Sequence, residues 1–315
     1  MGDLKEISIN GIQLAYRIVR GTACISGSSG RGSVLNLPEF IEEEGTKYPV
    51  TCIGKKAFLG CKGLREVDMP ESVTEIEDWA FSQCAHLRKI TIPALFDRTQ
   101  GNDFKLGRRV FEGCVSLSQI CRQKDDNGAI SYLCAALVSR LPAEYLLWDD
   151  EIGSKHWYEK WDLALSGFIL RKDNEGYTDT VLCGEEDISY DGIGSVDGEM
   201  LGETYEYVKS VCKNKSYLCL LRLVNDEMLD ATSRDIYSQY IRVHKRGVGN
   251  EAAWLTLTED IGDELEYYKV YASVAESEAD ELSEMIAQMG EDKAQAKAYL
   301  ISQSDKNDVV DMFAL

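Results

Sequence analysis

Apolar residues recur in matching columns through the first part of the chain. Phe58, Phe81 and Phe111 are each followed three residues later by a cysteine, and each cysteine is followed three residues later by a leucine. The phenylalanines are 23 and 30 residues apart, and the other two columns keep these intervals. A period in the twenties with apolar columns is typical of stacked units that bury their apolar sides only against their neighbours. The pattern therefore predicts a solenoid built from short repeated units.

Each predicted repeat contains a short strand that ends at a proline, within residues 34–38, 66–70 and 89–93. Side chains alternate between the two faces of a strand, so the apolar alternation directs one set inward. The predicted inward residues are Leu35, Leu37, Val67, Met69, Ile90 and Ile92. The opposite face, which includes the start of a fourth strand at 119–121, carries Asn36, Glu66, Asp68, Lys89, Thr91 and Gln119. Stacked units make this row continuous, so we predict that it binds partners.

The predicted array has a cap before it and a clear end. Residues 7–26 contain strand-like runs and the turn pairs Asn10-Gly11 and Arg20-Gly21, which predict an N-terminal β-hairpin. A solenoid needs a cap because its end unit otherwise leaves an apolar face in water. A polar insertion at 97–103 lengthens the third unit, and the fourth strand gives way to polar residues at 122–126. We predict a cap at 1–33 and repeats at 34–128.

From residue 129 onward, apolar residues take the spacing of helices. Ile130, Leu133, Leu137 and Leu141 follow the i, i+3, i+4 pattern of one helix face. The stretches that repeat this pattern are 157–170, 205–223, 236–243, 265–274, 279–289 and 294–301. Short helices with short polar joints favour antiparallel hairpins, or a second, α-helical solenoid. The fold class is therefore predicted to be α+β, with an α-helical, helical-hairpin domain at 129–315.

The net charge of −20 belongs entirely to the second half of the chain. Residues 1–130 hold 17 acidic and 17 basic side chains, whereas residues 131–315 hold 37 acidic and 17 basic ones (17 − 37 = −20). Such an acidic surface repels phosphate backbones, which argues against nucleic acid as a partner. The same field would attract a basic protein partner.

The repeated phrase resembles a known family of repeats. Residues 53–64 read Ile-Gly-Lys-Lys-Ala-Phe-Leu-Gly-Cys-Lys-Gly-Leu, and a strand and Pro-Glu-Ser-Val follow them. This pattern resembles the BspA-type leucine-rich repeat family over about residues 12–121. The resemblance implies a parallel-stranded solenoid that binds other macromolecules, in a family with many bacterial surface proteins. Near the C-terminus, residues 297–301 look like the last helix of ankyrin-like helical hairpin arrays.

Catalytic and metal-binding patterns are missing from the sequence. His86, His156 and His244 lie in different segments, and the chain lacks a nucleophile elbow, a P-loop and a dinucleotide-binding fingerprint. Its ten cysteines form no CxxC pair. Cys61, Cys84 and Cys114 are expected to stack about 4.8 Å apart, a distance that permits a disulfide, although packing of buried thiols is favoured. We therefore predict no catalytic residues, no metal site and no cofactor.

One acidic stretch partly matches a calcium loop. Asp187, Ser189 and Asp191 stand at the alternating positions of early ligands, and Gly192 follows at the turn. The twelfth position is Gly198, however, so the bidentate carboxylate is displaced by one residue. A glycine-rich acidic loop is the favoured interpretation.

These features favour a non-catalytic protein–protein interaction scaffold. The alternatives are a bacterial cell-surface adhesin of the BspA type whose leader has been removed, and a cryptic hydrolase that uses the acidic loops. Neither a leader nor a membrane-spanning stretch is visible, so the expected location is the cytoplasm, with the cell surface as the alternative. The oligomeric state and the partner's identity do not follow from the sequence.

Overall fold

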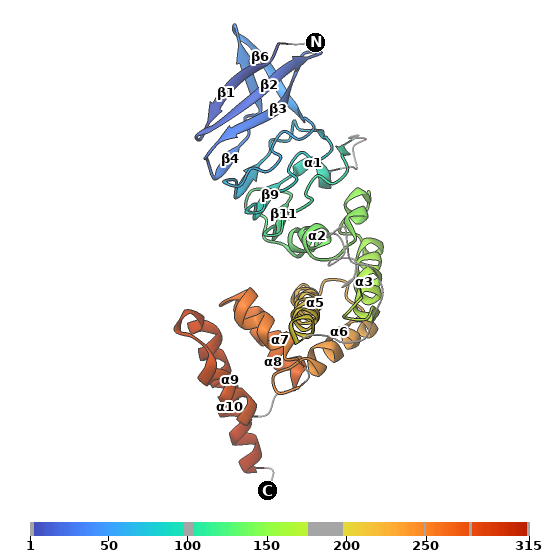
Figure 1. Ribbon diagram of the computed structural model, residues 1–315, viewed down its shortest axis with the longest axis vertical. Helices are drawn as coiled ribbons and strands as arrows, with labels where there is room; N and C mark the ends of the chain where they lie inside the picture. Colours follow the sequence, from blue (N-terminus) through green and yellow to red (C-terminus); the bar gives the residue numbers. More distant parts are fainter. Residues whose placement is uncertain (1–2, 98–103, 176–197, 249, 277–278, 314–315) are drawn as a thin grey trace. The chain divides into compact units, whose positions relative to one another are not determined.

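The computed structural model describes residues 3–97, 104–175, 198–248, 250–276 and 279–313 (Figure 1). Contacts divide the chain into two compact units, Met1–Trp161 and Asp162–Leu315. The first unit contains all the described strands and the second consists of helices. The mixed content confirms the α+β class.

The chain opens with an antiparallel meander of three strands. These are β1 (Lys5–Ile9), β2 (Ile12–Val19) and β3 (Thr22–Gly30). Both connecting turns use left-handed backbone: φ is 50° at Asn10 and 79° at Gly11, and 53° at Arg20 and 83° at Gly21. Consecutive positive φ values match the right-handed twist of the flanking strands, which is why Asn-Gly is a strong hairpin signal. The glycine-serine segment after Ile25 extends β3 alongside β2.

The repeats contribute strands to two separate sheets. Pairing in the first runs parallel from β3 through β6 (Thr46–Ile53) and β8 (Glu75–Ile76) to β10 (Lys105–Leu106). The second sheet consists of four parallel strands in the order β11-β9-β7-β4. Their bounds are β4 (Val34–Asn36), β7 (Glu66–Asp68), β9 (Lys89–Thr91) and β11 (Gln119–Cys121). A further strand, β5 (Phe40–Glu43), pairs with β6 antiparallel and was not predicted.

The phenylalanine column forms the core between the repeats. The ring centroids of Phe58 and Phe81 are 4.8 Å apart, with an angle of 2° between the ring planes. Those of Phe81 and Phe111 are 6.1 Å apart, with an angle of 17° between the planes. All three side chains are buried, as are the six residues predicted to point inward from the strands. The predicted stacking of successive units is therefore confirmed over these three repeats.

The cysteine column links neighbouring repeats through hydrogen bonds. The Cys84 thiol donates to the carbonyl oxygen of Phe58 at 3.0 Å, and the Cys114 thiol donates to that of Phe81 at 3.2 Å. The nine cysteines among the described residues are free thiols. The hydrogen bond with Cys114, together with burial, raises the pKa of Cys84, which keeps its thiol protonated. These thiols pack and donate within the stack, as the favoured interpretation predicted.

Each repeat also makes a tight turn after its phenylalanine. The residue two positions later has positive φ in all three units: 70° at Gly60, 61° at Gln83 and 76° at Gly113. Glycine adopts this conformation freely, whereas a residue with a Cβ atom is strained there. Gln83 therefore takes the conformation that its two glycine counterparts favour.

The first helices remain with the repeats. α2 (Ala129–Ser139) contacts β11, and the short helix η1 (Glu144–Trp148) follows it. The Trp157 indole of α3 (Lys155–Leu170) donates to the carbonyl oxygen of Leu146 at 3.1 Å, and that of Trp161 donates to Leu133 at 3.3 Å. These contacts explain why the boundary between the compact units falls after Trp161, later than the composition change near residue 130. The division into cap, repeats and helical domain stays a prediction.

The second unit is built around a long helix, α5 (Gly198–Val224), which contacts α6 (Ala231–Val243), α7 (Ala252–Leu255) and α8 (Leu265–Ala275). The π-helical turn η2 (Thr256–Ile261) follows α7 directly. α9 (Ala279–Gln288) contacts α10 (Ala294–Phe313), and the short helix η3 (Glu291–Lys293) lies between them in the chain. The helical periodicity therefore predicted the main helices correctly but missed the short ones. No helix among the described residues is long and apolar enough to span a bilayer.

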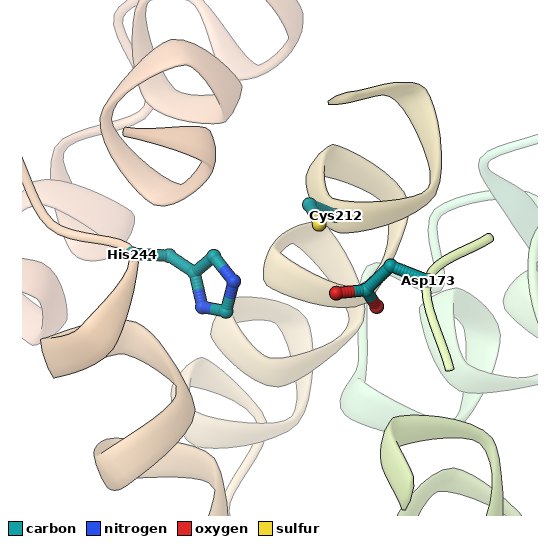
Figure 2. Close-up of side chains that lie close together, drawn as sticks. All are labelled: Asp173, Cys212 and His244. Carbon is teal, nitrogen blue, oxygen red and sulfur yellow. The ribbon is translucent and has the colours of Figure 1, made fainter. Parts of the chain in front are cut away.

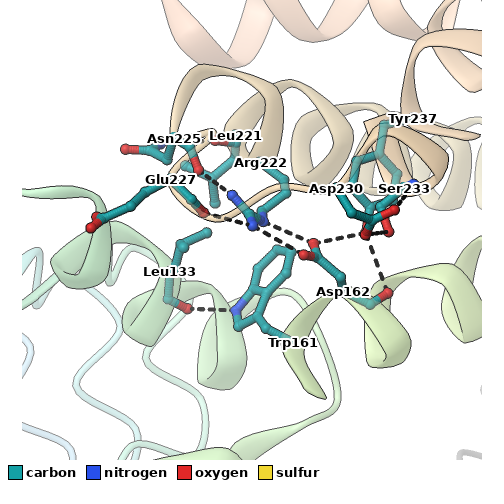
Figure 3. A network of polar contacts seen from close by, with 10 residues as sticks. All are labelled: Leu133, Trp161, Asp162, Leu221, Arg222, Asn225, Glu227, Asp230, Ser233 and Tyr237. Carbon is teal, nitrogen blue, oxygen red and sulfur yellow. Dashed lines mark hydrogen bonds and ion pairs between the residues drawn. The ribbon is translucent and has the colours of Figure 1, made fainter. Parts of the chain in front are cut away.

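A buried ion pair joins three segments of this unit (Figure 3). The Arg222 guanidinium donates to both carboxylate oxygens of Asp162, at 2.8 and 3.0 Å, and to the carbonyl oxygens of Asn225 and Glu227. The Tyr237 hydroxyl donates to the same carboxylate at 2.9 Å. Burial and the adjacent Asp162 charge raise the pKa of Tyr237, so it remains a donor. Because every charge here has partners, the network fixes α3, α5 and α6 together.

Candidate interaction surface

Four strands place the predicted binding residues on one sheet face. In register, Val34 lies beside Glu66, then Lys89, then Gln119, and this line forms the first row. The second row follows the next outward positions and consists of Asn36, Asp68, Thr91 and Cys121. Adjacent strands are about 4.8 Å apart, so both rows are continuous. We call these two rows the open face.

Exposure varies along the open face. Asn36 and Glu66 are exposed, and Asp68, Lys89 and Gln119 are half-buried. Thr91, in contrast, is only 3% exposed, so its predicted place in an accessible row is wrong.

The segment after β11 explains the burial at this end of the open face. The Gln119 side chain donates to the Asn127 side chain at 3.1 Å, and the Cys121 thiol donates to the Asp126 carbonyl at 3.2 Å. Both outward side chains of β11 are therefore covered by the following turn. Thr91 lies on the neighbouring strand, β9, at the same end of the sheet. The accessible part consists of β4, β7 and Lys89.

The accessible part has a mixed charge pattern. Glu66 lies beside Lys89 in register, and Asp68 lies beside Asn36. Val34 adds an apolar side chain that is 39% exposed. Opposite charges on adjacent strands are favourable neighbours, so part of this charge is balanced within the sheet. The pattern suits a polar partner surface with a small apolar contact.

The other residues considered from the sequence add no site within the described part of the chain. Asp187, Ser189 and Asp191 lie outside the described residues. His156 is exposed on α3 and lies 3.4 Å from the Glu159 carboxylate, a surface contact one helical turn away.

The structure does assemble one polar cluster that the sequence did not predict (Figure 2). Asp173 follows α3, Cys212 lies on α5, and His244 ends α6. One donor atom from each residue lies within 4.8 Å of the other two. The residues are too far apart in sequence to form a recognisable motif. The only advance signal was that His244 is one of just three histidines.

Burial dominates the electrostatics of this cluster. It raises the pKa of the Cys212 thiol, and the nearby Asp173 charge raises it further. Burial also raises the pKa of Tyr240, and the neighbouring Cys212 and Asp173 groups act in the same direction. Without a bound cation, both groups are therefore protonated at neutral pH.

Comparison with family models identifies the repeats. The model described as "BspA type Leucine rich repeat region" matches residues 41–125, with six copies. Residues 41–125 are a BspA-type leucine-rich repeat region. The resemblance predicted from the phenylalanine and cysteine columns is therefore confirmed for this region. The likeness of the C-terminal residues to ankyrin-like arrays stays a prediction.

Solved structures similar to this chain are also leucine-rich repeat proteins. One from Bacteroides ovatus is 32% identical, with a TM-score of 0.31, over 36% of this chain and 28% of that one. A leucine-rich cell surface protein from Faecalibacterium prausnitzii is 27% identical, with a TM-score of 0.30, over 38% of this chain and 30% of that one. The T. pallidum leucine-rich repeat protein is 30% identical, with a TM-score of 0.29, over 37% of this chain and 49% of that one. This chain thus spans less than half of each. No curated protein matches.

Proposed function

We propose that the chain is a non-catalytic scaffold that binds a protein partner through the open face of its leucine-rich repeat region. The observation that carries this proposal is the register of β4, β7 and β9, which lines up Asn36, Glu66, Asp68 and Lys89. Stacked repeats hold these side chains on a rigid backbone, so binding a partner costs little backbone conformational entropy. We also propose that the two open sheets are the sides of one continuous solenoid, and that the helices of the second unit pair as hairpins.

The partner is proposed to carry a basic surface. The acidic excess of the chain lies after residue 130, so its field attracts a basic protein and steers the encounter. The open face carries two acidic residues, Glu66 and Asp68, and one basic residue, Lys89. Its net charge is therefore negative, like that of the second half of the chain. Attraction of this kind weakens with salt, because exposed charges are screened within about 8 Å at physiological ionic strength.

The competing proposal is a surface adhesin of the BspA type. The BspA-type repeats support both roles, because the same repeat surface would serve a cytoplasmic or a surface partner. The free thiols of the described cysteines favour a reducing compartment, which supports the cytoplasmic scaffold. Cell fractionation with surface protease treatment separates the two: the adhesin is cleaved on intact cells and the scaffold is protected.

A charge-reversal series on the full chain tests the proposed surface. A partner is first isolated from source cells by cross-linking and is then purified, and its affinity is measured for the wild type, Glu66→Lys and Glu42→Lys. Glu42 is the matched control because it is also an exposed acid but lies on β5, outside the second sheet. We expect Glu66→Lys to weaken binding at least tenfold and Glu42→Lys to leave it within twofold. Equal effects of the two variants would remove the open face from the proposal.

A further inference from the structure

We propose that Asp173, Cys212 and His244 bind a single zinc ion in the helical unit. Their donor atoms, one sulfur, one nitrogen and one oxygen, lie within 4.8 Å of one another. Donors around tetrahedral zinc, with bonds of about 2.0–2.3 Å, are roughly 3.3–3.8 Å apart. A pair of donors at the 4.8 Å limit would have to approach each other by about 1–1.5 Å to bind the same ion. This inference is independent of the proposed binding function of the repeats.

His244 is already oriented as a metal ligand. Its Nδ1 lies 2.9 Å from the Tyr240 carbonyl oxygen, an acceptor, so Nδ1 carries the proton. The ring also stacks on the Tyr240 ring at 4.2 Å between centroids. The lone pair is thus on Nε2, and Figure 2 shows the ring extending toward Cys212 and Asp173. A histidine that donates its second nitrogen to a backbone carbonyl is the usual arrangement around a bound metal.

Asp173 is held in place by a buried lysine. The Lys215 ammonium, with a side chain only 1% exposed, donates to Asp173 Oδ1 at 2.7 Å. It also donates to the carbonyl oxygens of Ile169 and Arg171 at the end of α3. Lys215 lies one turn after Cys212 on α5, so the two residues share a helix face. This ion pair orients the carboxylate, whose second oxygen, Oδ2, would be the zinc ligand.

Tyr240 places a buried hydroxyl beside the cluster. The residue is 8% exposed, and its hydroxyl interacts with the Cys212 thiol. Zinc sites with three protein ligands keep a fourth position for water. A zinc-bound water beside Cys212 and Asp173 would offer the Tyr240 hydroxyl a further hydrogen-bond partner.

The geometry favours a metal over a cysteine–histidine catalytic triad. In a triad, the carboxylate binds the histidine nitrogen opposite to the nucleophile. Here the Tyr240 carbonyl takes that nitrogen, and Figure 2 shows Asp173 on the same side of the ring as Cys212. Thiolate, imidazole and carboxylate together are a ligand set typical of zinc. Coordination to the metal removes the thiol proton outright, which overcomes the effect of burial.

The test uses the full chain, freed of metal by chelation and then titrated with zinc or cobalt. We expect elemental mass spectrometry to find one equivalent of zinc per chain. In the cobalt titration, we expect the absorption spectrum to show a thiolate-to-cobalt charge-transfer band. Cys212→Ser and His244→Gln should weaken zinc binding more than tenfold, and the first should abolish the band. The matched controls are Cys219→Ser, also buried on α5, and His156→Gln, exposed on α3. Both should bind as the wild type does.

A second measurement needs no variant and so does not depend on variant folding. Peptide mapping after alkylation compares Cys212 with Cys219, with and without one equivalent of zinc. Zinc is expected to slow alkylation of Cys212 at least tenfold relative to Cys219. Failure of the wild type to bind stoichiometric zinc or cobalt, or equal protection of the two cysteines, overturns the proposal.

Discussion

Replacing Phe81 by alanine tests the stacking of the repeats most severely. Phe81 is fully buried, and its ring lies between those of Phe58 and Phe111. Truncation of a buried phenylalanine to alanine costs about 3–5 kcal/mol from lost transfer energy and the remaining cavity. Each aromatic contact adds about 0.5–1.5 kcal/mol beyond burial. Because Phe81 has two such contacts, we expect a loss near the upper end, about 4–5 kcal/mol.

A double-mutant cycle separates the stacking from general burial. The coupling energy between Phe58→Ala and Phe81→Ala should be about 1 kcal/mol, and that between Phe58→Ala and Phe111→Ala close to zero. Urea denaturation followed by circular dichroism, together with hydrogen exchange of the repeat amides, gives these values in the full chain. A loss below about 1 kcal/mol for Phe81→Ala, or equal coupling for the two pairs, would refute the stacked arrangement.

Three further predictions concern stability and have definite signs. Arg222→Met should lower the free energy of unfolding by about 3–5 kcal/mol, because it removes the ion-pair partner of the buried Asp162 carboxylate. Adding Asp162→Leu to this variant should restore much of the lost stability. Thermal unfolding of the two variants and the wild type measures both effects. Gly60 and Gln83 both have positive φ, which glycine adopts without strain. In urea titrations, Gly60→Ala should therefore lower stability by about 1 kcal/mol, and Gln83→Gly should raise it by up to about 1 kcal/mol. Stability changes of the same sign in the two variants would contradict this explanation. Asp230 accepts hydrogen bonds from the Ser233 hydroxyl and from two backbone amides at the start of α6, and these bonds lower its pKa in the folded protein. The stability that Asp230 contributes is therefore fully present above its unfolded-state pKa of about 4. It is lost as the pH falls through the lower pKa of the folded state. Asp230→Ala should therefore cost about 1 kcal/mol at pH 7 and little at pH 2, and a difference that persists unchanged at pH 2 would exclude this explanation.

Local patterns predicted the repeats well because their signals lie close together in the chain. Phe58, Phe81 and Phe111 recur with matching cysteine and leucine columns, and each column position packs against its own counterpart. The same period places the inward and outward residues of β4, β7 and β9. The helices after residue 129 were predicted equally well from the 3.6-residue period of their apolar residues, because that period arises wherever one face of a helix is buried.

Features set by distant contacts could not be predicted in the same way. Thr91 has the strand position of an outward residue but is buried beside β11, whose outward side chains bond to the turn that follows. The zinc cluster depends on Lys215 bringing Asp173 to α5, and a buried lysine is an unlikely choice from sequence alone. The unit boundary moved past Trp161 because two tryptophan indoles tie α3 to earlier carbonyls.

Site-specific photo-cross-linking on the full chain tests the proposed binding face most directly. A photoreactive residue is placed at Glu66 on the open face or at Glu42 on β5, and adducts are captured in source cells at matched expression. The scaffold proposal predicts a strong, salt-sensitive adduct with one basic protein at Glu66 and none at Glu42. An adduct with the same protein at Glu42, and none at Glu66, would contradict it.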